Sequence, residues 1–191
     1  MATDRREDAA QAARASGRTG AAALNVFITG ASSGIGAALA RHYAKRGANV
    51  GLLARRADAL TGLANELPSE RCATYAGDVR DSAALDRAAR EFITRFGAPD
   101  VVIANAGVSL GALTDHAEDL PVFRTVIETN VIGIVNTFAP FVAVMRAAGR
   151  GTLVGVASVA GFRGLAGSGA YSASKAAAIT YLESLRLELR D

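Results

Sequence analysis

Several residue types are scarce in this sequence, and each scarcity excludes a class of protein. The 191 residues contain no tryptophan, four prolines and one cysteine. A single cysteine cannot form an internal disulfide, nor a metal site built from several cysteines. Because Cys72 lies in an apolar stretch, we expect a buried structural thiol and not a reactive one. With 50% hydrophobic residues and 20 glycines, the composition is typical of one compact α/β domain.

Charge is also sparse and balanced. The formal net charge is +3 and no long basic run occurs, so we expect no nucleic-acid partner. No run of about 18 or more apolar residues is present, so we expect no membrane span. His42 and His116 are the two histidines and have no matching partner, so we predict exposed positions for both and no metal site. A soluble, cytoplasmic protein fits these features best.

The first 23 residues differ in character from the rest of the chain. They are rich in alanine, mix arginines with Asp4, Glu7 and Asp8, and lack the apolar stretch of a secretion signal. We expect residues 1–23 to form a disordered extension. A transit peptide is the alternative, and the early acidic residues argue against it.

From Leu24 onward, short apolar runs alternate with longer helical patterns. The expected strands are Leu24–Thr29, Asn49–Ala54, Cys72–Tyr75, Asp100–Ala104 and Gly151–Ala157. The expected helices cover about 34–46, 57–66, 81–96, 121–148 and 170–190. Gly47 and Gly149 follow two of these helices, where a left-handed C-cap favours glycine, and Asp81 stands at an N-cap position. Five strand–helix units in a row predict a Rossmann-type, doubly wound parallel sheet in one domain, 24–191.

The chain stops at Asp191, inside the last expected helix. A six-stranded doubly wound sheet needs at least one more strand. We therefore expect the domain to be incomplete at its C-terminus and the natural protein to continue.

The first expected strand leads directly into Thr29-Gly30-Ala31-Ser32-Ser33-Gly34-Ile35-Gly36. Glycines at 30, 34 and 36 allow a tight turn, a close approach to a ligand and close packing of the next helix. The start of that helix directs free N–H groups and its positive dipole end at the turn, which suits a pyrophosphate. A glycine cluster alone is weak evidence, but this one follows a strand and opens a helix. The segment therefore predicts dinucleotide binding.

This turn, with its Gly-x-x-x-Gly-x-Gly spacing, resembles that of the short-chain dehydrogenase/reductase family, and further motifs agree in order and spacing. They are Asp78-Val79, Asn105-Ala106-Gly107, Asn130, Ser158 and Tyr171-x-x-x-Lys175. The resemblance implies a catalytic set of Asn130, Ser158, Tyr171 and Lys175. It also implies cofactor contacts from Gly30, Ser32, Ser33, Gly34, Ile35, Gly36, Asp78, Val79, Asn105, Ala106, Gly107, Tyr171 and Lys175.

The residues themselves support the same chemistry. Tyr171 and Lys175 are four apart, so at a helix start they share one face. A tyrosine hydroxyl ordinarily ionises near about pH 10, and a nearby ammonium favours the phenolate. Tyr171 can then exchange a proton with a carbonyl or an alcohol. Ser158 is expected to end the fifth strand and orient the substrate oxygen, while by resemblance Asn130 bends its helix and holds a water that links Lys175 to solvent.

The second expected strand ends in Leu52-Leu53-Ala54-Arg55-Arg56. Enzymes that use NAD carry an acidic residue near this place, whereas this sequence has Ala54 there. An arginine beside the ribose can bind a 2′-phosphate, so we predict NADP(H), with Arg55 as the first candidate and Arg56 as the second. The alternative is two solvated arginines at a helix start.

Three other functions use related folds: a non-catalytic NADP sensor, a sugar-nucleotide epimerase and a methyltransferase. The intact Tyr171 and Lys175 argue against the first. The epimerases share these two residues but usually have a longer chain and a different glycine turn, and a methyltransferase has no use for Ser158, Tyr171 and Lys175 together. The substrate cannot be read from the sequence beyond a partly apolar carbonyl or secondary alcohol near Phe162, Arg163 and Leu165. By resemblance, apolar residues of the helices near 121–148 and 170–190, including Phe138, Phe141 and Leu182, predict a homodimer or homotetramer.

Overall fold

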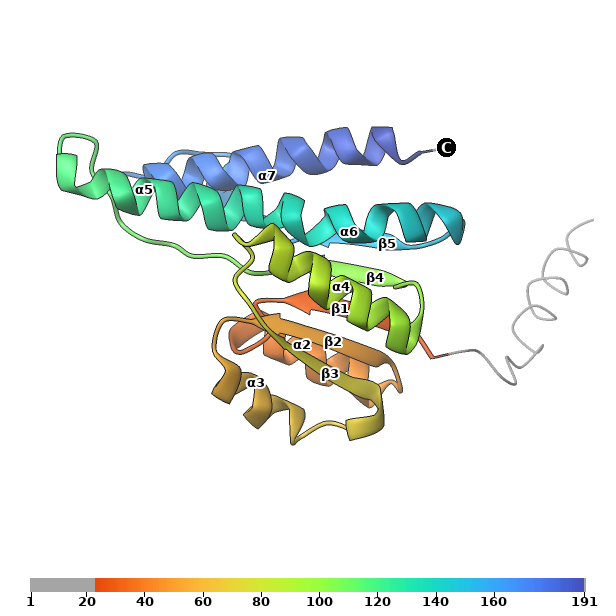
Figure 1. Cartoon of the computed structure of the whole chain (residues 1–191). Helices are drawn as coiled ribbons and strands as arrows, with labels where there is room; N and C mark the ends of the chain where they lie inside the picture. The colour runs from red at the N-terminus through yellow and green to blue at the C-terminus, as the bar shows by residue number, and fades with distance from the viewer. Residues whose placement is uncertain (1–22, 191) are drawn as a thin grey trace, which may run out of the picture.

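The computed structural model describes residues 23–190 and places five parallel strands in one sheet (Figure 1). The strands are β1 (Asn25–Thr29), β2 (Asn49–Ala54), β3 (Cys72–Ala76), β4 (Val101–Ala104) and β5 (Thr152–Gly155). Their order is β3-β2-β1-β4-β5, and every neighbouring pair is parallel. The chain therefore adds β2 and β3 on one side of β1, and then crosses over to add β4 and β5 on the other side. This reversal creates a crevice at the carboxyl ends of β1 and β4, where doubly wound sheets bind ligands.

Helices cover both faces of the sheet, as predicted (Figure 1). They are α2 (Gly34–Lys45), α3 (Ala57–Ala64), α4 (Ser82–Phe96), α5 (Leu120–Ile127), α6 (Gly133–Ala147) and α7 (Gly169–Glu188), joined in places by short turns η1 (Ser69–Arg71), η2 (Ala117–Asp119), η3 (Glu128–Ile132) and η4 (Val159–Gly161). One apolar cluster joins the sheet to α2 and α3, and a second joins it to α4, α6 and α7. The Rossmann-type fold is confirmed.

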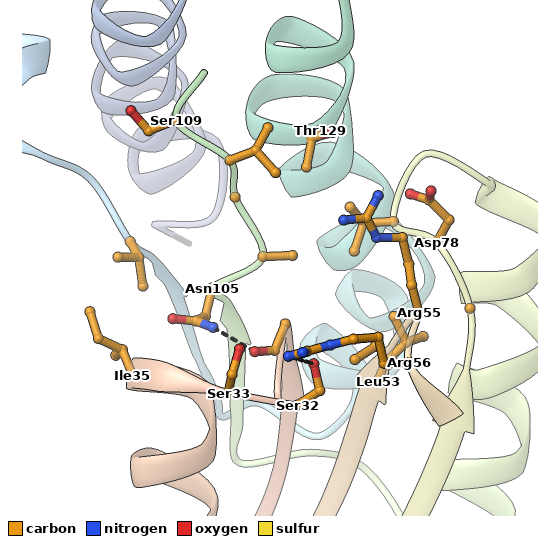
Figure 2. A pocket seen from close by; sticks show the side chains of 18 of the residues that line it. Ser32, Ser33, Ile35, Leu53, Arg55, Arg56, Asp78, Asn105, Ser109 and Thr129 are labelled. Carbon is orange, nitrogen blue, oxygen red and sulfur yellow. Dashed lines mark hydrogen bonds between the residues drawn. The ribbon is translucent and has the colours of Figure 1, made fainter. Parts of the chain in front are cut away.

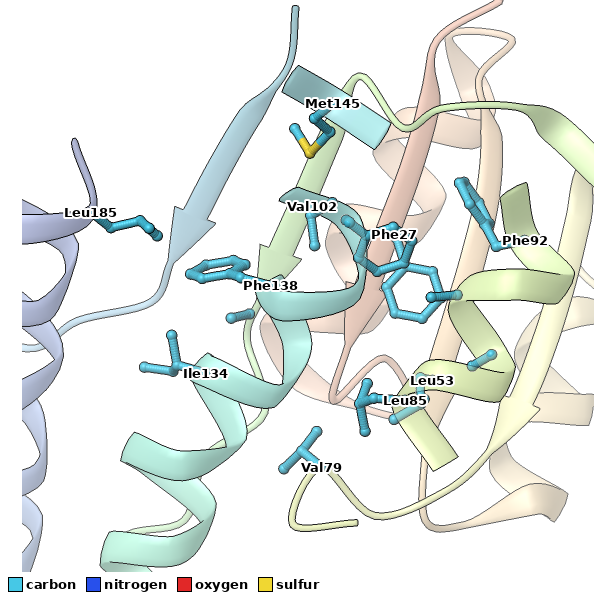
Figure 3. Packing of buried hydrophobic residues seen from close by; sticks show 14 of the residues in the cluster. Phe27, Leu53, Val79, Leu85, Phe92, Val102, Ile134, Phe138, Met145 and Leu185 are labelled. Atoms are coloured by element: carbon cyan, nitrogen blue, oxygen red, sulfur yellow. The ribbon is translucent and has the colours of Figure 1, made fainter. Parts of the chain in front are cut away.

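Alternation along β1 separates the two apolar clusters. Val26 and Ile28 pack toward α2 and α3, whereas Phe27 packs among Phe92 and Phe141 on the other face (Figure 3). Gly51 in β2 leaves room for these rings, because a Cβ there would lie 2.5 Å from Phe92 Cδ2. The close ring packing holds α4 and α6 against the centre of the sheet.

The predicted helix ends are confirmed at three positions. The Oδ1 atom of Asp81 accepts a hydrogen bond of 3.1 Å from the amide of Ala84 and so caps α4. Gly47 and Gly149 have φ values of +78° and +62°, the left-handed conformation that glycine adopts without a steric cost. These caps fix where α2 and α6 give way to β2 and β5.

Two expected elements differ from the structure. The helix expected near 121–148 is interrupted by η3, a π-helical turn that contains Asn130, the residue expected by resemblance to bend this helix. The fifth strand was expected to reach Ala157 but ends at Gly155, because the chain leaves the sheet there for η4. Ser158 therefore lies beyond the strand and does not end it.

Other expectations concern single residues and the chain start. Cys72 is buried, and both histidines are exposed, as expected. Phe138 and Phe141 are 1% and 0% exposed, so they belong to the core and cannot supply an intersubunit surface. The expected disordered extension, 1–23, falls outside the described residues except for its last residue.

One helical stretch, Ala117–Ala147, is long and apolar enough by length and composition to cross a membrane. It comprises η2, α5, η3 and α6, and it supplies Val126, Ile134, Phe138 and Phe141 to the buried core. Packing against the sheet therefore accounts for part of its apolar character, while other apolar residues of the stretch are exposed.

Candidate active site

A cleft of about 540 Å³ opens at the carboxyl ends of β1, β2, β4 and β5. Its walls come from the turn after β1, the end of β2, the loops after β3, β4 and β5, and the start of α7. The cleft thus lies at the reversal of strand order described above.

The turn after β1 is shaped for close approach of backbone to backbone. Gly30 has a φ of +67°, and a Cβ on it would lie 2.7 Å from Ala106 Cα. A Cβ on Gly36 would lie 2.4 Å from the carbonyl oxygen of Gly30. The Nδ2 atom of Asn105 donates to the carbonyls of Thr29 (3.0 Å) and Gly30 (3.2 Å), so the loop after β4 holds the turn in place.

The start of α2 offers free donors to this cleft. Ser33 occupies the N-cap with an extended backbone and no side-chain capping bond. The first N–H groups of a helix have no partner within it and carry a partial positive charge. A small turn with such donors fits a pyrophosphate, as the sequence predicts.

Two arginines follow β2 and point in different directions (Figure 2). Arg56 Nη2 donates to Ser32 Oγ at 3.2 Å, beside the glycine-rich turn. Arg55 reaches toward Asp78 on the other side of the cleft (Figure 2). Asp78 accepts two hydrogen bonds from the Arg80 guanidinium, at 2.7 and 3.0 Å. Side-chain hydrogen bonding to Arg80 is the main reason why the pKa of Asp78 is lowered. The end of β2 therefore presents two guanidinium groups to an anionic ligand.

Tyr171 and Lys175 lie on the first turns of α7 and line the cleft together with Ser158. Lys175 is 5% exposed, and its Nζ donates to the carbonyl of Val156 at 2.6 Å and lies 5.8 Å from the Tyr171 ring centroid. Burial lowers the pKa of Lys175. Ser158 begins η4, where its Oγ accepts a 3.2 Å bond from the amide of Ala160.

Asn130 is fully buried within η3, behind the cleft wall. Its Oδ1 accepts from the amide of Val108 at 2.8 Å, and its Nδ2 donates to the carbonyl of Val108 at 2.9 Å. A Cβ on Gly107 would lie 3.2 Å from Asn130 Oδ1 and 3.6 Å from Lys175 Nζ. The amide of Asn130 and the ammonium of Lys175 therefore converge beside Gly107.

This geometry agrees with the sequence comparison. The model of the short chain dehydrogenase family matches residues 24–191. The chain belongs to the short-chain dehydrogenase family. Members of this family are oxidoreductases that bind nicotinamide cofactors.

Relatives of this chain include an uncharacterized oxidoreductase of Myxococcus xanthus, which is 42% identical over 169 residues. That match covers 86% of this chain and 65% of the relative. An Arabidopsis thaliana protein named 11-beta-hydroxysteroid dehydrogenase-like 4A is 38% identical, and the match covers 86% of this chain and 56% of the relative. This chain thus spans roughly two thirds or less of both relatives.

Solved structures of the family have the same fold. An alcohol dehydrogenase from Thermococcus sibiricus complexed with 5-hydroxy-NADP superposes with a TM-score of 0.80 at 31% identity, covering 87% of this chain and 72% of that one. A variant actinorhodin polyketide ketoreductase with NADPH gives a TM-score of 0.82 at 31% identity, covering 87% and 65%.

Most of the residues predicted for the site line the cleft. Gly34, Gly36 and Asn130 do not line it. Gly36 and Asn130 are buried beside the cleft, whereas Gly34 is exposed at the start of α2. Lining residues that the sequence reasoning missed are Leu53, Gly77, Val108, Ser109, Thr129, Val156 and Ala157. Val108 and Val156 act through backbone groups, which side-chain motifs do not reveal. Thr129 could have been found, because it precedes Asn130 in the chain.

Proposed function

We propose that this protein transfers a hydride between NADP(H) and a carbonyl or secondary-alcohol substrate. The observation that carries the proposal is that Ser158, Tyr171 and Lys175 line the same cleft as the glycine-rich turn. A ligand bound on that turn therefore meets a hydroxyl, a phenol and an ammonium at one end of a continuous cavity.

The described residues fit a dinucleotide. The turn at Gly30 has no room for a side chain, because a Cβ there would lie 2.7 Å from Ala106 Cα. The start of α2 supplies donors for a pyrophosphate. Asp78 and Val79 border the region for the adenine, and Asn105, Ala106 and Gly107 border the region nearer Lys175. A bound nicotinamide would supply or accept the hydride.

Each side chain near Tyr171 then has a proposed task. Tyr171 donates its proton to the carbonyl oxygen during reduction, or accepts one during oxidation. Ser158 donates a hydrogen bond that orients the same oxygen. Lys175 binds the nicotinamide ribose and favours the phenolate of Tyr171 through its positive charge. Asn130 serves a proton path between Lys175 and solvent, beside Gly107.

The proposed preference for NADP(H) is supported by the end of β2. Ala54 stands where a carboxylate would repel a 2′-phosphate, and Arg55 and Arg56 both line the cleft. Contact of Arg56 with Ser32 keeps one guanidinium beside the turn. Two of the related structures hold NADPH or 5-hydroxy-NADP. A guanidinium binds a phosphate through paired, charge-assisted bonds.

Cofactor titration and a screen of carbonyl compounds, both with the whole protein, test this proposal. We expect NADPH to bind at least about tenfold more tightly than NADH, equivalent to about 1.4 kcal/mol. The double variant Ala54→Asp with Arg55→Ser should reverse the preference. The control is Arg41→Ser, which changes an exposed arginine of α2 that pairs with Glu66, and it should leave the preference unchanged.

Two results would contradict the proposal. Equal binding of NADPH and NADH by the unchanged protein would rule out the assigned 2′-phosphate site. Binding of NADPH without oxidation by any carbonyl in the panel would favour the alternative, a non-catalytic NADP sensor. We also propose a cytoplasmic location, which cell fractionation tests.

A further inference from the structure

A buried serine joins the two segments that carry the proposed catalytic groups. Ser174 on α7 is fully buried. Its hydroxyl donates to the carbonyl oxygen of Tyr171 at 2.7 Å and accepts a 3.0 Å bond from Asn130 Nδ2. One hydroxyl thus connects η3 with the first turn of α7.

We infer that Ser174 is a positioning residue that sets Tyr171 and Lys175 relative to the amide of Asn130. This inference rests on the proposed function, because it assigns Ser174 a role in the reaction at Tyr171. Ser174 does not line the cleft, so it acts through its neighbours and not on the substrate.

The bonds form a continuous chain across three segments. Val108, in the loop after β4, exchanges two hydrogen bonds with the Asn130 amide, which donates its remaining N–H to Ser174. Ser174 then holds Tyr171 through its carbonyl. Because Nδ2 has two donors and both are used, the rotation of the Asn130 amide is fixed. Its Oδ1 is thereby kept on the amide of Val108, on the side of Gly107 where Lys175 Nζ also lies.

Helix stability alone does not account for this serine. A serine hydroxyl bonded to a carbonyl of the preceding turn slightly destabilises a helix, and alanine is the better helix former. Ser172, two residues earlier, is also buried, but its Oγ accepts from the amide of Leu165 at 3.3 Å and so holds the loop before α7. The contact with Asn130 belongs to Ser174.

Misplacement of the reacting groups by a fraction of an ångström reduces turnover much more than it reduces binding. Ser174→Ala removes both bonds and leaves one N–H of Asn130 without its partner in a buried site. The cofactor turn and the arginines after β2 are not touched, and Lys175 keeps its own bond to the carbonyl of Val156. We therefore expect a defect in kcat and little change in NADPH affinity.

The experiment measures kcat and NADPH affinity in the whole protein for Ser174→Ala, Asn130→Ala and the double variant. We expect Ser174→Ala to lower kcat by about tenfold with NADPH affinity within about twofold. In the Asn130→Ala background, the same change should lower kcat by less than about twofold, because the amide to be held is gone. Thr137→Val is the matched control, since Thr137 is fully buried on α6 and bonds only to Gly133 of its own helix among the described contacts.

Each outcome decides the inference. A kcat for Ser174→Ala within about twofold of the unchanged protein would overturn it, as would fully additive effects of the two substitutions. An equal loss in Thr137→Val would also overturn it, because any buried hydroxyl would then suffice. Tyr171→Phe separates the two claims: if that variant is inactive while Ser174→Ala is fully active, only the role of Ser174 fails. If Tyr171→Phe is fully active, the proposed function itself fails.

Discussion

At the residue scale, Lys175 illustrates how a site residue carries a cost to stability. Its ammonium is buried, and among the described residues it forms no ion pair. Its Nζ donates to the carbonyl of Val156, which satisfies one donor of three. Burial of a charge with so few partners is unfavourable, and this is the physical cause of the lowered pKa of Lys175.

Lys175→Met should therefore stabilise the fold and abolish turnover. Methionine keeps the length of the side chain without a buried charge, so we expect a gain on the order of 1 kcal/mol at neutral pH. The folded chain binds the Lys175 proton less tightly than the unfolded chain does. The free energy of unfolding of the unchanged protein thus rises with pH between the lowered value and about 10.4, and the advantage of methionine shrinks over that range.

Urea unfolding of both proteins near about pH 7 and about pH 10 measures this difference. A stability gap between the two proteins that is constant across this range would contradict the account of Lys175 as a buried, uncompensated charge. Lower stability of Lys175→Met at neutral pH would contradict it as well, since the bond to Val156 would then outweigh the burial of the ammonium.

At the element scale, the turn between β1 and α2 depends on glycine for space as well as for conformation. Gly36→Ala would force a methyl group to 2.4 Å from the carbonyl oxygen of Gly30 and 2.6 Å from Asn105 Nδ2. Neither neighbour can move without opening the bonds that hold the turn. We expect Gly36→Ala to weaken NADPH binding by at least about tenfold, or about 1.4 kcal/mol.

Gly62→Ala is the matched control for that prediction. Gly62 lies inside α3, and a Cβ on it meets nothing within 4 Å. Alanine there should stabilise the helix by about 1 kcal/mol and leave NADPH binding unchanged. Calorimetric titration of both variants decides the matter. NADPH affinity in Gly36→Ala equal to that of the control would mean that the turn tolerates a side chain and is not the phosphate site.

The same scale explains which elements the sequence could predict. Apolar runs and glycine C-caps placed the five strands and most helices, because strands buried on both faces are continuous in hydrophobicity. The bend at Asn130 was expected only from the family resemblance. Periodicity does not locate it, since α5 and α6 each place apolar residues in the core. The early end of β5 was missed because Val156 and Ala157 remain apolar after the strand ends.

At the scale of the whole molecule, exposed apolar side chains recur along α5, η3 and α6. Leu120 is 55% exposed, Phe123 40%, Ile132 47% and Val135 36%. They face away from the core that contains Phe138 and Phe141. Contiguous exposed apolar patches often mark contact surfaces, so we propose that a homodimer or homotetramer, as the sequence predicts, buries these side chains.

Light scattering at micromolar concentration should find an oligomer of the whole protein, and Phe123→Glu should shift it toward the monomer. In an isologous contact each subunit carries the substitution, so the cost of burying the carboxylate is counted twice. Arg87→Glu on the exposed face of α4 is a suitable charge control and should not change the mass. A monomeric unchanged protein would contradict the proposed assembly.

The candidate site is also a property of the whole molecule. Sequence motifs named Tyr171, Lys175, Ser158 and Asn130 individually. Only the topology brings the first three to the cleft that the turn after β1 begins, with Asn130 buried behind them. The motifs could not predict the hydrogen bonds that hold these side chains. Lys175 donates to the carbonyl of Val156, and Asn130 donates to the hydroxyl of Ser174. Such bonds depend on how α7 and η3 pack, which no local pattern encodes.

The most direct test of the central claim compares Tyr171→Phe with the unchanged whole protein, using one carbonyl substrate that the unchanged protein reduces. Phenylalanine keeps the ring and removes only the hydroxyl that exchanges the proton. NADPH affinity should stay within about twofold, while kcat should fall by about 10²–10⁴-fold, the contribution typical of a general acid. A variant that keeps more than about a tenth of the original kcat would show that Tyr171 is not the proton donor.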